Sequence, residues 1–306
     1  MNASITRGIQ KFKHEIHING IAYVLAAPMA IMIIVVIIIP IIRVVYMSFF
    51  DYYLARPSSH PFIGLQNYIK LFMDKTFFVS VRVTLIYIFV TVILRYVLGL
   101  GIALLLHEKF PGRGLARSIM IIPWAVPEVV ACLIFIQMFD YQYGIINYWL
   151  SQLGIIHEPL KWLSDLKLAL PSAMLVNIWK GTPWAAIMLL AGLQSIPESL
   201  YEAAKIDGAN AWQRFKNVTL PLLKPISLAV FLLLVIWTIK DFAIVYVLNK
   251  GGPARATEVL TIFLYHKGFE GLRMGVASAA GVILLIVSMI FTVIYLKAME
   301  GDESVW

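Results

Sequence analysis

Polar side chains interrupt one of the long apolar stretches of this 306-residue chain, at residues 168–192. There Asn177, Lys180, Gly181 and Trp184 recur at three- and four-residue spacing, which places them on one face of a helix. Amide and ammonium groups can hydrogen-bond hydroxyls, and an indole ring can stack on the apolar face of a sugar. The face therefore suits a hydroxyl-rich solute. The same residues equally suit helix packing, because small and amide side chains hold membrane helices together.

A second polar feature is the adjacent pair Lys240-Asp241, which falls within the apolar stretch 226–248. This position predicts a mid-helix location, where ionisable groups cost free energy and normally face the protein interior or water. Because neighbouring residues on a helix point in different directions, the two side chains either contribute to the same solute site or pair with other helices.

The elements that must position these residues are transmembrane helices. The chain is 60% hydrophobic and 14% charged, with a mean hydropathy of +0.83. A bilayer core needs about 20 apolar residues per helix, which predicts an all-α membrane protein with a single transmembrane domain at 21–297. Pro123 and Pro127 predict a kink in the third span. The predicted spans are 21–46, 78–106, 117–139, 168–192, 226–248 and 274–297.

An even number of spans places residues 1–20 and the tail 298–306 on one side of the membrane. Lys and Arg are concentrated before the first span and in the loop 107–116, which predicts that these segments and the hairpin 195–225 are cytoplasmic. The formal charge of +8 is thus explained by topology, and nucleic acid is not an expected partner.

Neither a metal site nor an enzyme active site is predicted. Cys132 is a single cysteine within an apolar run, and His14-Glu15-Ile16-His17 is one residue short of a zinc-protease motif. The chain has no G-x-x-x-x-G-K-[ST] phosphate loop and no G-x-S-x-G nucleophile motif. Any energy from ATP must therefore come from another subunit.

The hairpin 195–225 is a polar segment between the fourth and fifth spans. Ser195 and Glu198 match a capping box and Gly208 can end the helix, so we expect a helix of about three turns. Ala203 and Ala204 leave part of its surface nearly flat. Such a helix fits a groove on a partner protein.

The hairpin also carries the spacing EAA-x2-DGA-x5-F-x4-LP, which resembles the cytoplasmic signature of binding-protein-dependent ABC importer permeases. Further matches are the FIGLQNY segment at 62–68, PWAVP at 123–127 and the GGP turn at 251–253. Together, over about residues 20–297, they resemble carbohydrate-uptake permeases of the maltose and glycerol-3-phosphate type. The signature residues are Glu202, Ala203, Ala204, Asp207, Gly208, Ala209, Phe215, Leu220 and Pro221.

This resemblance implies a multi-pass subunit of the cell (inner) membrane that forms half of a translocation pathway and performs no chemistry. Implied partners are a second permease subunit, two cytoplasmic ATPase subunits that bind ATP and Mg²⁺, and an extracytoplasmic solute-binding protein. The resemblance makes the hairpin a coupling helix whose Glu202 pairs with a basic residue of the ATPase.

The resemblance also aligns Asn177, Gly181 and Trp184 with the solute site of maltose-type permeases. Lys240 and Asp241 fall where those permeases have polar residues of different charge. The expected solute is therefore a carbohydrate, with glycerol-3-phosphate or another polyol or anion as the alternative. A stand-alone secondary transporter is less favoured, because it needs ion-coupling acids and Asp241 is the single deep carboxylate suggested.

Overall fold

The computed structural model describes residues 23–56 and 58–303, so the whole predicted N-terminal segment 1–20 and the last three residues lie outside the described part. Within the described part the chain is helical, with isolated β-bridges in place of strands. A first helix reaches Ser48 and contains the π-helical turn η1 (Ile34–Ile38) and α2 (Ile39–Ser48). The following helices are α3 (Gln66–Met73), α4 (Lys75–His107), α5 (Arg113–Met120), α6 (Ile122–Ala125), α7 (Glu128–Met138), α8 (Ile145–Gln152), α9 (Ala169–Ser195), α10 (Glu198–Ile206), α11 (Ala211–Arg214), η2 (Phe215–Thr219), α12 (Leu220–Ile239), α13 (Ala243–Asn249), α14 (Leu260–Tyr265), η3 (His266–Glu270) and α15 (Met274–Glu303).

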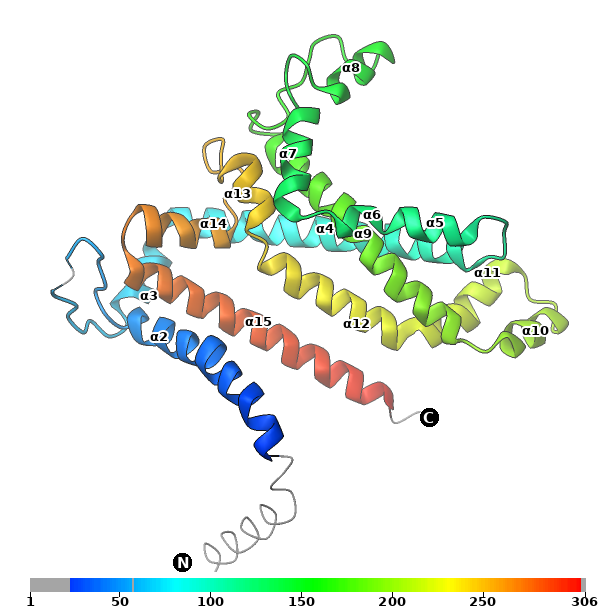
Figure 1. Cartoon of the computed structure of the whole chain (residues 1–306), viewed down its shortest axis with the longest axis horizontal. Helices are drawn as coiled ribbons and strands as arrows, with labels where there is room; N and C mark the ends of the chain where they lie inside the picture. Colours follow the sequence, from blue (N-terminus) through cyan, green and yellow to red (C-terminus); the bar gives the residue numbers. More distant parts are fainter. Residues whose placement is uncertain (1–22, 57, 304–306) are drawn as a thin grey trace, which may run out of the picture.

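The predicted all-α membrane architecture is confirmed. Five described helices are long and apolar enough to cross a membrane, and a bent pair of helices makes a sixth span. α4 packs along α9, where Gly99 allows close approach because a Cβ there would lie 2.9 Å from the Ala185 Cβ. α15 lies between α2 and α12 (Figure 1). Cys132 is buried in the core, as its apolar surroundings predicted.

The third span is sharply bent. Segments Arg113–Ala125 and Glu128–Met138 meet at 92°, and Figure 1 shows α7 turned away from α5 and α6. Val126 has an extended backbone (φ −65°, ψ 131°), as expected for a residue before proline, and Pro127 follows it. The predicted proline kink is thus confirmed, and it gives a bend large enough to open space beside α9.

The fifth span differs from its prediction. The helical segment begins at Ala211, well before residue 226, and α12 ends at Ile239. Lys240 is its C-cap residue, and the helix resumes as α13 only at Ala243. The prediction that Lys240 and Asp241 lie mid-helix is therefore wrong, because the apolar runs before and after this pair belong to two helices and not to one.

The start of the coupling hairpin also differs from its prediction. Ser195 is the last residue of α9, and its Oγ donates a hydrogen bond to the Gly192 carbonyl at 2.8 Å instead of capping the next helix. α10 begins at Glu198, one residue after Pro197, and has no side-chain N-cap. A capping box does form farther on, between Asn210 and Gln213 at the start of α11.

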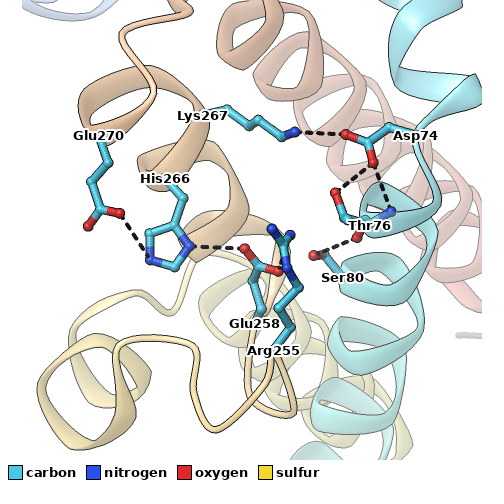
Figure 2. Close-up of polar contacts among 8 residues, drawn as sticks. All are labelled: Asp74, Thr76, Ser80, Arg255, Glu258, His266, Lys267 and Glu270. Atoms are coloured by element: carbon cyan, nitrogen blue, oxygen red, sulfur yellow. Dashed lines mark hydrogen bonds and ion pairs between the residues drawn. The ribbon is translucent and has the colours of Figure 1, made fainter.

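Asp74 fixes the start of α4. Its Oδ1 accepts hydrogen bonds from Thr76 N (2.8 Å) and Thr76 Oγ1 (2.7 Å), and Oδ2 accepts one from Lys267 Nζ (2.8 Å; Figure 2). Partial burial raises the pKa of this carboxyl, but the hydrogen bonds from Lys267 and Thr76 and the Lys267 charge outweigh it and bring the pKa down from 3.8 to about 2. The carboxylate thus joins α3, α4 and η3 at one end of the molecule.

Replacing Asp74 by alanine is expected to lower the free energy of unfolding in detergent by roughly 1–2 kcal/mol, mainly through loss of the N-cap. Asp74→Asn keeps the cap and is expected to cost less. Because the folded pKa is depressed, the stabilising contribution is complete above about pH 4 and is lost as the pH falls from 4 toward 2. Thermal unfolding of the three proteins at pH 7, 4 and 3 tests this. A wild-type advantage over Asp74→Asn that does not shrink with acid would contradict the assignment.

Candidate solute cavity and coupling helix

A polar cavity of about 670 Å³ lies where the bend of the third span, α9 and the break after α12 come together. Five of the six residues predicted to contact solute line it. These residues are Asn177, Lys180, Gly181, Lys240 and Asp241. The other lining residues are Arg95, Trp124, Ala125, Val126, Pro127, Glu128, Trp237, Phe242, Ala243 and Ile244. The periodicity of α9 thus brings its polar face to this cavity.

Asp241 is held by side chains from two other spans. Its Oδ2 accepts a hydrogen bond from the Tyr87 hydroxyl of α4 at 2.5 Å and one from Asn177 Nδ2 of α9 at 2.7 Å. Its backbone carbonyl accepts a hydrogen bond from Thr261 Oγ1 at 2.6 Å. The break after α12 therefore turns this carboxylate toward α4 and α9 and fixes it there.

Arg95 provides a buried cation beside this carboxylate. The residue is 6% exposed, and its Nη1 donates to Asn177 Oδ1 at 3.2 Å and to Thr238 Oγ1 at 3.3 Å. Its Nε has no hydrogen-bond partner in the described part of the chain. The guanidinium occupies the space left by Gly181, because a Cβ there would lie 2.1 Å from Arg95 Cζ. Gly181 thus makes room for the cation.

Lys180 links α9 to the bend of the third span. Its Nζ donates to the carbonyls of Trp124 (3.2 Å) and Val126 (2.8 Å), which α6 leaves unpaired as it ends. Trp184 does not line the cavity. It packs edge-on against Trp237, a lining residue, with ring centroids 4.5 Å apart.

The solute site predicted from the sequence did not include Arg95, Tyr87 or Thr238. A signal existed for Arg95, since an arginine deep in an apolar stretch needs partners. A tyrosine and a threonine in such stretches carry no comparable signal.

The lining of the cavity carries three basic side chains and two carboxylates, so it has one more basic group than acidic groups. The described residues contain no cluster of metal-ligating side chains.

The helix of the EAA signature is exposed at the opposite end of the molecule from α3 and α14 (Figure 1). No residue of α10 is buried, and Glu202 and Ala203 are exposed. Ile206 is 86% exposed, which is unusual for isoleucine in a soluble environment and is typical of a contact surface. Gly208 has a left-handed backbone (φ 79°), so it ends α10 as predicted.

Glu198 ties α10 to the loop that follows α4. Its Oε1 accepts a hydrogen bond from Lys109 Nζ at 3.0 Å. This hydrogen bond lowers the pKa of the Glu198 carboxyl, with help from the Lys109 charge. Both groups are well exposed, so the bond helps to orient the hairpin and adds little stability.

Solved structures share the fold of this chain. A bacterial alginate ABC transporter, in complex with an alginate pentasaccharide-bound periplasmic protein, contains a chain that matches with a TM-score of 0.80 and 22% identity, over 92% of this chain and 94% of that one.

Comparison of sequences identifies the family. Residues 95–300 match the model of the binding-protein-dependent transport system inner membrane component. The trehalose/maltose transport system permease protein MalF of Thermococcus litoralis is 41% identical over 78% of this chain and 79% of its own. The sulfoquinovosyl glycerol transport system permease protein SmoG of Agrobacterium fabrum is 38% identical over 92% of this chain and 91% of its own.

The chain therefore belongs to the family of binding-protein-dependent transport system inner membrane components. It is an integral inner-membrane protein and a permease subunit, which confirms the resemblance found in the sequence.

Proposed function

We propose that this permease carries a carbohydrate across the inner membrane through the cavity between the bent third span, α9 and the break after α12. The observation that carries the proposal is the convergence of Asn177, Lys180, Lys240 and Asp241 on one cavity beside an indole ring. Amide, ammonium and carboxylate groups hydrogen-bond hydroxyls, and Trp237 offers a surface for a sugar ring. The relatives named for trehalose, maltose and sulfoquinovosyl glycerol transport support this solute class.

The proposed assembly contains a second permease subunit, two ATPase subunits that bind ATP and Mg²⁺, and a solute-binding protein outside the membrane. The exposed α10 is the proposed ATPase contact, through Glu202, Ala203, Ala204, Asp207, Gly208 and Ala209. Phe215, Leu220 and Pro221 then carry the motion into the helical segment of the fifth span. In the proposed topology the termini, the loop 107–116 and the hairpin 195–225 are cytoplasmic.

An anionic carbohydrate is the second candidate solute. The cavity lining has one more basic side chain than carboxylates, and the Arg95 Nε has no hydrogen-bond partner in the described part of the chain. A carboxylate, sulfonate or phosphate on a sugar would match this excess. Uncharged disaccharides need no such match.

The test is ATP-driven uptake into proteoliposomes by the complete complex, with a panel of radiolabelled trehalose, maltose, glycerol-3-phosphate and an acidic oligosaccharide. We expect uptake of at least one sugar that stops when the binding protein or ATP is omitted. Uptake of glycerol-3-phosphate or the acidic sugar alone would favour the anionic solute. Uptake of none, in a complex whose ATPase is active, would overturn the proposal.

A further inference from the structure

Four aromatic rings form a continuous cluster that begins at the cavity, and we call them the aromatic ladder: Phe242, Tyr246, Tyr265 and Phe269. Phe242 contacts both Tyr246 and Tyr265, the latter at 5.4 Å between centroids, and Phe269 extends the cluster from Tyr265. Phe242 and Tyr246 stack at 4.8 Å between centroids, and Tyr246 meets Tyr265 at 4.9 Å. Tyr265 then stacks on Phe269 at 5.3 Å. The ladder crosses from α13 to α14 and η3, so three consecutive elements build it together.

The ladder is continuous with the cavity at its inner end. Phe242 is a lining residue, and it follows directly after Asp241. Its outer end lies with α14 and η3, on the side of the molecule away from the coupling helix α10 (Figure 1). In the proposed orientation, the series therefore extends from the cavity toward the outer surface, where solute arrives.

The rings remain accessible, although the core would normally bury such groups. Phe242, Tyr246 and Tyr265 are half-buried and Phe269 is 61% exposed. Phe269 lies outside the helices that are long and apolar enough to span a membrane, and together with three partly exposed rings it offers aromatic surface to a ligand.

Polar contacts of neighbouring residues hold the helical turn η3, which carries the outer ring Phe269. His266 Nδ1 lies 2.9 Å from Glu258 Oε1, and Lys267 Nζ donates to Asp74 Oδ2 at 2.8 Å (Figure 2). Glu258 is 1% exposed and also accepts a hydrogen bond from Arg255 at 3.0 Å. These contacts hold η3, which carries Phe269, against the rest of the protein, so the position of the Phe269 ring is preorganised.

The edges of the ladder are polar. The Tyr246 hydroxyl donates a hydrogen bond to the Tyr265 hydroxyl at 3.3 Å. Two charged residues close to the ladder in sequence are exposed: Lys250, the C-cap residue of α13, and Glu270, the last residue of η3. A pyranose ring has an apolar C–H face that stacks on an aromatic ring and a rim of hydroxyls that needs donors and acceptors. Lipid chains would match the rings but would offer no further hydrogen bonds to the polar groups at their edges.

We propose that the aromatic ladder is a binding track on which pyranose rings stack in turn as solute passes from the outer surface to the cavity. This inference rests on the proposed carbohydrate transport. It adds a second binding region, outside the cavity, with its own recognition chemistry.

The test measures KM and kcat of ATP-driven uptake by the complete complex in proteoliposomes, for the sugar of the panel that the wild type transports. Phe269→Leu and Tyr265→Leu keep apolar bulk but remove the ring. Each is expected to raise KM roughly three- to tenfold, the range of an aromatic stacking contact, with kcat nearly unchanged. Phe269→Trp is expected to keep the wild-type KM. Tyr143→Leu is the control, because Tyr143 is 89% exposed and lies outside the ladder.

Three results would overturn the track. An unchanged KM in Phe269→Leu and Tyr265→Leu would show that sugar does not stack there. Loss of the second permease subunit from the purified Leu variants would identify the ladder as a subunit interface. Absence of uptake of every sugar by the wild type would remove the proposed function and the track together.

Discussion

Glu202→Ala is expected to abolish ATP-driven uptake while the subunit still inserts and folds. Glu202 is exposed on α10, a helix with no buried residue, so its side chain contributes nothing to the packing of this subunit. In the proposed complex its carboxylate pairs with a basic residue in the ATPase cleft. Truncating one partner of a buried charge pair at an interface costs about 2–5 kcal/mol, which weakens ATPase binding about 30-fold or more.

The control for this prediction removes the same charge elsewhere on the side that we propose to be cytoplasmic. Glu108 is exposed in the loop after α4, outside the coupling helix. Glu108→Ala is expected to keep normal uptake and ATPase content in the purified complex. Co-purification of the ATPase and uptake rates should be measured for both variants. Full uptake by Glu202→Ala would refute the coupling role of this residue.

Gly181→Ala is expected to reduce uptake by at least about tenfold, because the new methyl group takes the place of the Arg95 guanidinium. A Cβ at this position would lie 2.1 Å from the Arg95 Nε and Cζ atoms. The guanidinium would have to leave its hydrogen bonds to Asn177 and Thr238, each worth about 1.5–3 kcal/mol for a charged donor. It would then enter the cavity and alter both its shape and its charge distribution.

Gly101→Ala is the matched control, since Gly101 also lies within a long helix, α4, and a Cβ there would meet no atom within 4 Å. It is expected to leave uptake unchanged. Because the end of an arginine side chain can move, we expect both variants to fold and assemble. Uptake and subunit content should therefore be compared in the same preparations. Equal uptake by the two variants would show that the position of Arg95 does not matter for transport.

The sequence predicted the face of α9 that lines the cavity, because helical periodicity alone determines which residues share a face. Asn177, Lys180 and Gly181 reach the cavity for that reason. Trp184 shares the spacing but lies one turn beyond the cavity, against Trp237. How far a cavity extends along a helix depends on its neighbours, which periodicity does not report.

The other departures come from backbone breaks and contacts between distant segments. Apolar residues lie on both sides of Lys240-Asp241, so the two runs were assigned to one span, and the pattern gave no sign that α12 ends there and that Asp241 turns toward Tyr87. Ser195 has the side chain of an N-cap, but the helix before it extends far enough to include it. Arg95 stands in an apolar stretch of the sequence, whereas its place over Gly181 depends on how α4 and α9 pack.

The most direct test of solute passage through this cavity is a cryo-electron microscopy structure of the complete complex, trapped with ATP and an inactive ATPase in the presence of a transported sugar. We predict density for a sugar ring in the cavity, within hydrogen-bonding distance of Asn177 or Asp241. Density confined to the second permease subunit, with this cavity empty, would contradict the account.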